Sequence, residues 1–259
     1  MKLALTLLLL TFTSLFAKEP KVELGLGVFT LSYPDYLGSK STQLLTAPFP
    51  HVRYRGEFLT IDEDGINGKL FGVDGLRLDL SVSGSLPANS EDSKAREGMS
   101  DLDFTGEVGP KLVYNIYEHG VALLEFELPV RTVLSTDLSS VEYRGIVSTP
   151  QLKYSLNYTK FEWTFRSGVM FANERYHNYF YGVSQEYVTP TRSQYKASGG
   201  YSGFRNRMGM TYQKGSWWAG AFISHFSIAN AVFNDSPLVE TDSGLYMGAS
   251  VAYIFYTEN

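Results

Sequence analysis

The chain has 259 residues, a formal net charge of −5 and no cysteine. The mildly acidic balance argues against nucleic-acid binding, which favours a basic face. The lack of cysteine excludes disulfides, thiol chemistry and cysteine-based metal sites.

The first 17 residues predict a secretory signal peptide. Lys2 supplies a positive charge, residues 3–16 form an uncharged run, and Ala17 precedes a charged stretch, so we expect cleavage after Ala17. The alternative is a single transmembrane anchor, but a run of about 15 residues is short for a span of roughly 20. We expect residues 18–259 to form one domain.

The composition favours a transmembrane β-barrel. The chain contains 18 Tyr, 17 Phe and 24 Gly, yet its mean hydropathy is only −0.12. In a membrane barrel one face of each strand is apolar and the other is polar, so the average cancels. A periplasmic β-sandwich is the alternative that composition leaves open.

Ten segments of about 10–15 residues show strand-like alternation. A membrane strand needs about 9–11 residues at its usual tilt, whereas soluble strands average about 5–6. Length therefore favours an all-β, antiparallel, up-and-down transmembrane barrel of about ten strands. The segments are 22–33, 49–60, 76–86, 103–116, 120–132, 142–156, 161–171, 198–212, 217–230 and 244–256.

The second segment contains the string HVRYRGEF, residues 51–58, in which apolar or small residues alternate with ionisable ones. A period of two places the two classes on opposite faces of a strand. In a soluble sheet the charged face would meet water. In a barrel Val52, Tyr54 and Phe58 would meet lipid, and Arg53 and Arg55 would point inward.

Short and long connections alternate along the chain, as they do in outer-membrane barrels. Residues 117–120, 157–160 and 213–216 are predicted tight periplasmic turns. The long outer connections are expected at 34–48, 87–102, 133–141, 172–197 and 231–243. This scheme treats 61–75 as one irregular periplasmic connection. If 64–72 is a strand instead, a further strand within 174–183 would give twelve.

Two prolines, Pro110 and Pro150, fall inside predicted strands. Proline removes a ladder donor and is confined to edges, strand ends or bulges. We therefore expect a bulge near Pro150, where the alternation also changes phase, and a similar irregularity at Pro110.

Charged side chains of both signs are predicted to face the barrel interior. A barrel of about eight strands has room only for side chains, so ten strands favour a plugged or narrow lumen. The alternative is a selective channel in which the arginines form an anion path. The set is Arg53, Arg55, Glu57, Arg77, Asp79, Glu107, Lys111, Glu125, Glu127, Arg131, Glu162, Arg166, Arg205 and Arg207.

One weak catalytic arrangement lies near the C-terminus. His225 and Ser227 are two residues apart and would share a strand face, with Glu240 beyond a loop as an orienting carboxylate. The spacing is similar to that of outer-membrane lipid A 3-O-deacylases. The competing interpretation is that all three are ordinary polar residues. The four histidines show no metal-ligand spacing, and we expect neither a metal nor a cofactor.

Several strings resemble the MipA/OmpV family of outer-membrane proteins. They are YPDYLGS (33–39), APFPHVRYRG (47–56), NYFYGVSQEY (178–187), YKASGGY (195–201) and NDSPLV (234–239). They occur in family order across nearly the whole mature chain. A departure is that the last strand ends before Thr257, whereas many such barrels finish on a terminal aromatic residue.

The resemblance implies a barrel in the outer membrane of a Gram-negative bacterium, surrounded by lipid. It also implies a non-enzymatic scaffold whose partners are a lytic transglycosylase and a murein synthase. We expect the partner to contact periplasmic turns, with 61–75 as the longest candidate. A narrow channel and a lipid A deacylase-like hydrolase remain the alternatives.

Overall fold

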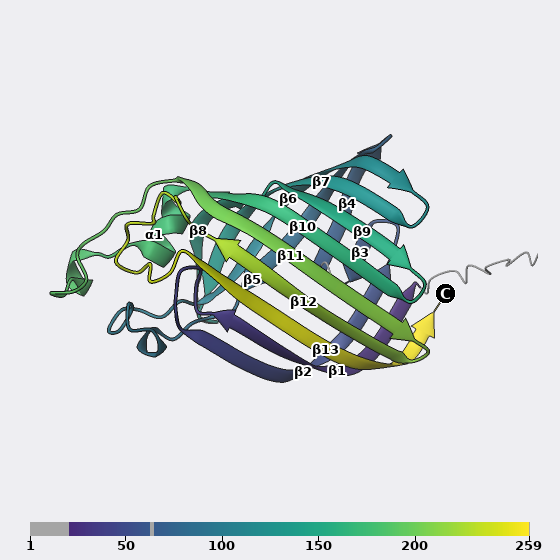
Figure 1. Ribbon diagram of the computed structural model, residues 1–259, viewed down its shortest axis with the longest axis horizontal. Helices are drawn as coiled ribbons and strands as arrows, with labels where there is room; N and C mark the ends of the chain where they lie inside the picture. The colour runs from purple at the N-terminus through teal and green to yellow at the C-terminus, as the bar shows by residue number, and fades with distance from the viewer. Residues whose placement is uncertain (1–20, 63–64, 259) are drawn as a thin grey trace, which may run out of the picture.

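The computed structural model describes residues 21–62 and 65–258, so the predicted signal peptide lies outside the described residues. One antiparallel sheet closes on itself through pairing of β10 with β11 and of β1 with β13 (Figure 1). The strands are β1 (Val22–Pro34), β2 (Thr42–Arg55), β3 (Leu59–Asp62), β4 (Gly65–Val73), β5 (Leu76–Ser85), β6 (Phe104–His119), β7 (Ala122–Thr136), β8 (Val141–Ser148), β9 (Gln151–Tyr158), β10 (Phe161–Ala172), β11 (Gly200–Lys214), β12 (Trp217–Ser227) and β13 (Ser243–Glu258).

Strands β8 and β9 occupy a single position in the barrel wall, which therefore has 12 positions. Both pair with β7 on one side and with β10 on the other. The interruption falls at Thr149-Pro150, where proline has no N–H to donate. The expected irregularity at Pro110 also occurs, because the ladder between β6 and β7 skips Gly109 and Pro110.

The predicted barrel class is confirmed, and the preferred count of ten is close but low. Residues 61–75 are not an irregular connection, because most of them form the end of β3 and all of β4. The proposed strand within 174–183 was wrong, since the helix α1 (Glu174–Tyr181) occupies it. Strand β2 also begins at Thr42, seven residues before the predicted start at 49.

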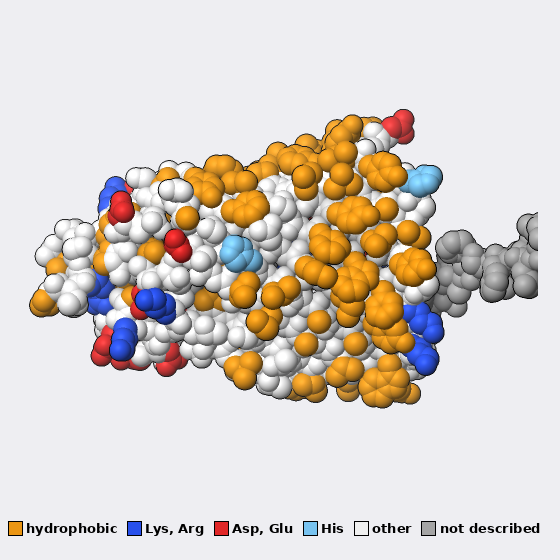
Figure 2. Space-filling model, in the orientation of Figure 1, with side chains coloured by type: hydrophobic (Ala, Val, Ile, Leu, Met, Phe, Trp, Pro, Cys, Tyr) orange, Lys and Arg blue, Asp and Glu red, His pale blue; other side chains and the backbone are white. Residues whose placement is uncertain are grey.

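Side chains alternate between the two faces of the wall. Outward positions carry apolar residues, such as Leu26 at 65% exposure and Phe255 at 63%, and these cover the strands in Figure 2. Charged side chains gather instead at the ends of the molecule (Figure 2). Within the described chain, no helix has the length and apolar character needed to cross a membrane.

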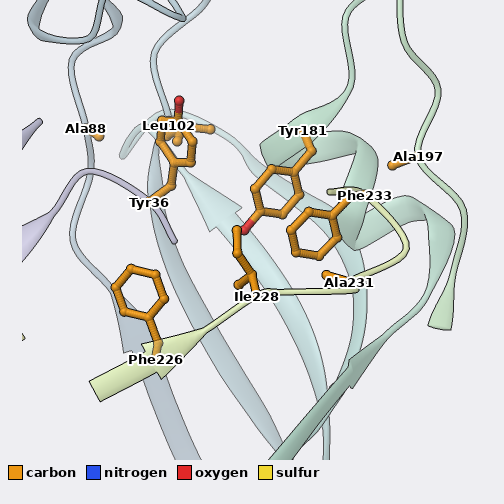
Figure 3. Close-up of a cluster of buried hydrophobic side chains, with 9 residues drawn as sticks. All are labelled: Tyr36, Ala88, Leu102, Tyr181, Ala197, Phe226, Ile228, Ala231 and Phe233. Carbon is orange, nitrogen blue, oxygen red and sulfur yellow. The ribbon is translucent and has the colours of Figure 1, made fainter. Parts of the chain in front are cut away.

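The long connections gather at one end of the barrel and the tight turns at the other (Figure 1). We call residues 35–41, 86–103, 173–199 and 228–242 the loop cap. It contains α1, whose first turn is capped by Asn173, and two short 3₁₀ helices, η1 (Ser90–Asp92) and η2 (Gln185–Tyr187). The loop cap has its own hydrophobic core, drawn in Figure 3, in which the rings of Tyr181 and Phe233 stack 3.7 Å apart.

Candidate functional site in the barrel lumen

The lumen near the turn end is filled by a network centred on Glu23, whose side chain is 1% exposed. Arg53 Nη1 lies 3.6 Å from Glu23 Oε2 and donates to Gln213 Oε1 at 3.0 Å. Gln213 Nε2 in turn donates to Glu23 Oε1 at 3.0 Å. Arg53 Nη2 also lies 3.8 Å from Glu162 Oε2. The network therefore joins β1, β2, β10 and β11 across the lumen.

A second network crosses the opposite side of the lumen. Arg77 lies 2.8 Å from Asp79 and 3.3 Å from Glu125, while Lys153 lies 3.6 Å from the other Glu125 oxygen. Glu125 therefore receives cations from two different strands. The side chains of Asp79 and Glu125 are nearly fully buried, and such charges are tolerated only when they are paired.

Glu127 organises the adjoining part of this network. Its carboxylate lies 3.5 Å from Lys111 Nζ and accepts a 2.6 Å hydrogen bond from Gln151 Nε2. Lys111 Nζ also donates to Asn67 Oδ1 at 2.7 Å. Asn67 belongs to β4, so this short strand contributes to the interior and not only to the wall.

Toward the loop cap the lumen becomes rich in cations. A cavity of about 150 Å³ lies there, and its charged lining residues are Lys111, Glu127, Arg131, Arg166, Arg205 and Arg207. Arg131 lies 3.5 Å from Glu107 and donates to Ser81 Oγ at 2.9 Å. Arg205 Nε is buried and has no hydrogen-bond partner among the described residues. The positive excess makes this region suited to an anionic group.

Buried polar contacts hold the loop cap together. Arg96 donates to the carbonyl oxygens of Phe180 and Ser100, both at 3.0 Å. Arg192 donates to the carbonyl oxygens of Ala95 and Glu97, also at 3.0 Å. These bonds tie residues 86–103 to 173–199 through side chain–backbone contacts.

His177 is a fully buried histidine at the base of this cap. Its Nδ1 lies 2.6 Å from the Ser198 carbonyl oxygen, which can only accept, so Nδ1 carries a proton. Its Nε2 lies 2.7 Å from Ser202 Oγ. Burial lowers the pKa of His177, which favours the neutral ring. Burial also raises the pKa of Tyr36 to about 12, so its hydroxyl stays protonated and donates to the Leu238 carbonyl oxygen.

A family model described as MltA-interacting protein MipA matches residues 24–255. The chain belongs to the MipA family. Its resemblance to MipA/OmpV proteins, inferred from short strings, is thereby confirmed.

Two relatives of the MipA-family chain are outer-membrane proteins. Omp26La of Vibrio anguillarum is 25% identical over 205 residues, covering 78% of this chain and 76% of that protein. OmpV of Vibrio cholerae serotype O1 is 24% identical over 205 residues with the same coverage. Together with the barrel fold, they place the MipA-family chain in the outer membrane.

Two solved structures are similar to the MipA-family barrel. A bacterial polysaccharide outer membrane secretin has 12% identity and a TM-score of 0.43, covering 90% of this chain and 98% of that one. The CymD monoaromatic hydrocarbon channel has 9% identity and a TM-score of 0.36, covering 93% and 90%.

The MipA-family barrel does not assemble the weak catalytic arrangement. His225 is exposed on the outward face of β12 and lines a surface groove that extends across β10 and β11 to Leu152 and Tyr154 of β9. Ser227 Oγ accepts from Ala229 N, and Glu240 accepts from Lys40 N. Across the described ranges, no hydrogen bond or ion pair joins any two of the three.

Two predicted lumen charges of the MipA-family chain lie at the turn end. Arg55 is the last residue of β2 and is half-buried. Glu57 is exposed in the turn between β2 and β3, so the structure corrects its assignment to the lumen. Sequence reasoning also missed Glu23, Gln213 and Lys153. Glu23 and Lys153 lie between apolar neighbours, and Gln213 continues the alternation of β11, so extending the same period of two could have found them.

Proposed function

We propose that this chain is a non-enzymatic outer-membrane scaffold that holds a lytic transglycosylase at its periplasmic end. The observation that carries the proposal is the match to the MltA-interacting family over residues 24–255. Two features support it. The loops of the cap pack around a hydrophobic core at the outer end of the barrel, and ion pairs cross the lumen, as suits an anchor better than an open pore. A murein synthase is the proposed second partner of the same scaffold.

The partner would meet the turn end, because short turns of outer-membrane barrels face the periplasm. The earlier candidate, 61–75, offers little free chain, since β3 and β4 occupy most of it. The contact surface is therefore the rim of strand ends and two-residue turns. Next to His119, at the turn between β6 and β7, Tyr117 is 53% exposed and Val121 is 49% exposed, giving an apolar patch on this rim.

Site-specific photocrosslinking in intact envelopes tests this proposal. A photoreactive phenylalanine analogue at His119 or Thr159 is expected to capture a murein-cleaving enzyme. The matched control is Leu138, which is 87% exposed at the opposite end, between β7 and β8. Capture of that enzyme at Leu138, or at none of the turn positions, would contradict the scaffold.

A narrow channel is the second candidate, and the cation-rich cavity favours it. A ring of basic side chains is a recognised way to select anions. Planar-bilayer recordings distinguish the two functions. The scaffold predicts little steady conductance while the loop cap is folded, whereas the channel predicts steady anion-selective openings that disappear in Arg205→Gln.

A further inference from the structure

The barrel wall is interrupted between β2 and β5. Strand β2 pairs with β1 along Thr42–Tyr54 but with β3 only at Tyr54 and Arg55. Strands β3 and β4 are short and lie in the half of the barrel away from α1 (Figure 1). On the far side of this hairpin, and within residues 21–62 and 65–258, Val82–Ser85 of β5 pair only with β6. Among the described residues, Thr42–Arg53 therefore has no strand partner except β1.

The interruption, which we call the window, lies in the half of the wall next to the loop cap. The backbone of Gly65 at the start of β4 comes close to the Val82 carbonyl oxygen, so the described part of the hairpin reaches that level. Beside it, β2 and β5 are three inter-strand spacings apart, roughly 14 Å. Ser41 Oγ donates to the Asp92 carbonyl oxygen and bridges the window at its outer limit. The opening therefore faces the outer leaflet of the membrane.

Two prolines lie on the open edge of β2. Arg55 N donates to Lys21 O on the β1 side, whereas Gly56 N donates to Leu59 O on the β3 side. Backbone groups alternate between the two edges of a strand, so even-numbered residues of β2 point toward the window. Pro48 and Pro50 are even-numbered and have no N–H. Such residues blunt an edge against strand addition, which disfavours a protein strand as the occupant.

The lumen behind the window has an apolar sector. Inward positions of β12, β13, β1 and β2 carry aromatic and aliphatic side chains instead of the usual polar ones. Phe29 and Phe49 make an edge-to-face contact at 6.1 Å, and Phe49 packs against the buried cluster of Trp218, Ala252 and Ile254. A cavity of about 360 Å³ is lined here by Phe29, Leu31, Trp218 and Phe222.

Aromatic rings of the apolar sector contact the guanidinium groups of the cation-rich region. The Arg207 guanidinium lies 3.9 Å from the centre of the Phe222 ring, and that of Arg205 lies 5.8 Å from the Tyr246 ring. A second cavity, of about 320 Å³, is lined by Ser83 and Leu86 at the window, by Arg205, and by Leu31 and Phe222, which it shares with the first. Both volumes fall in the range of small-molecule sites, about 300–1,000 Å³.

We propose that the lumen binds a single-chain anionic amphiphile that arrives from the outer leaflet through the window. Its acyl chain occupies the cavity beside Trp218, and its carboxylate or phosphate group contacts Arg205, whose Nε lacks a partner in the described structure. Charge complementarity selects an anionic headgroup, and the cavity volume excludes a lipid with several chains. This site is independent of the proposed scaffold, because it lies inside the lumen, whereas the scaffold's partner would contact the outer rim of the turns.

Trp218 provides a direct probe of the site. The chain has three tryptophans, and the alternation of β10 and β12 directs Trp163 and Trp217 outward. In a Trp163→Phe/Trp217→Phe variant in nanodiscs, dibromostearate is expected to quench Trp218 fluorescence saturably. Dibromostearoyl lysophosphatidic acid distinguishes a phosphate head from a carboxylate, and the brominated fatty acid methyl ester controls for partition without charge.

In the same background, Arg205→Gln is expected to weaken binding of the preferred probe about tenfold or more, which is the usual contribution of a charge-assisted hydrogen bond to affinity. Lys214→Gln, an equal charge change at the exposed end of the same strand, should leave affinity unchanged, and Arg205→Lys should restore part of it. Heat-dependent gel mobility verifies folding of each variant. Equal quenching by the methyl ester, or undiminished binding in folded Arg205→Gln, would overturn the site.

Access through the window has its own test. Destabilising the loop cap by Leu238→Ala, at a fully buried cap residue that lines neither cavity, should leave the rate of Trp218 quenching unchanged, because the ligand does not pass through the cap. A faster rate in Leu238→Ala would instead assign access to the outer end and refute the window.

Discussion

Replacing Arg53 tests whether the Glu23 network is a coupled unit. The Glu23 and Arg53 side chains are 1% and 9% exposed, and Arg53 is the arginine that lies nearest to the Glu23 carboxylate, at 3.6 Å. Removing one member of a buried ion pair costs about 3–5 kcal/mol, because the other charge stays buried without compensation. Replacing both by apolar residues of similar volume is often neutral or stabilising. Arg53→Met is therefore expected to lose about 3–5 kcal/mol, and Glu23→Leu/Arg53→Met is expected to recover most of it.

The measurement is the free energy of unfolding from urea titrations in phospholipid vesicles, with Glu23→Leu completing the double-mutant cycle. Lys214→Met is the matched control, since Lys214 is an exposed cation near the same end of the barrel. It should change stability by less than about 0.5 kcal/mol. If the two single substitutions add in the double variant, the reasoning about coupling is refuted.

Three further predictions address the cap and the wall. Phe233→Ala should destabilise the loop cap by about 3–5 kcal/mol, accelerating amide exchange in 228–242 but not in β12, whereas half-exposed Val232→Ala should not. Because the fold lowers the pKa of His177 from 6.5, the cap is most stable above pH 6.5 and loses stability as the pH falls toward the pKa of the folded state. Amide hydrogen exchange in α1 should therefore become faster at acidic pH, and His177→Gln should remove this pH dependence. Gly109→Ala would place a Cβ against the Val130 carbonyl oxygen and should prevent the barrel from folding, whereas Gly106→Ala, whose Cβ would meet open space, should fold. Heat-dependent gel mobility measures folding of both variants.

The barrel class was predictable because alternation is a local property that survives in every long strand. The hairpin of β3 and β4 was not, since β3 has only four residues and Gly68 and Gly72 interrupt the pattern of β4. Glycine adds no side chain to either face, so a period of two cannot be read there. The same glycines explain why 61–75 resembled an irregular connection.

The partners of the lumen charges were not predictable, because they are fixed by closure of the barrel and not by local sequence. Arg53 and Gln213 are 160 residues apart, and Arg96 bonds to a carbonyl 84 residues away. Alternation assigns a face to a side chain but gives no information about which strand lies opposite. The same limit applies to His177. The spacing of the histidines in the sequence does not indicate its role, although its two ring nitrogens contact Ser198 and Ser202 at the base of the cap.

The short hairpin and the prolines of β2 are physically consistent with each other. If β3 continued alongside Thr42–Arg53, Pro48 and Pro50 would leave two carbonyl groups of that neighbour without donors inside the membrane, where each unmet group is costly. With the hairpin short, the same prolines instead remove two donors from an edge that faces lipid. Pro48→Ala/Pro50→Ala should therefore restore two unpaired N–H groups at the window and lower the stability of the barrel in bilayers. Equal or greater stability of this double variant would show that the edge is satisfied in another way.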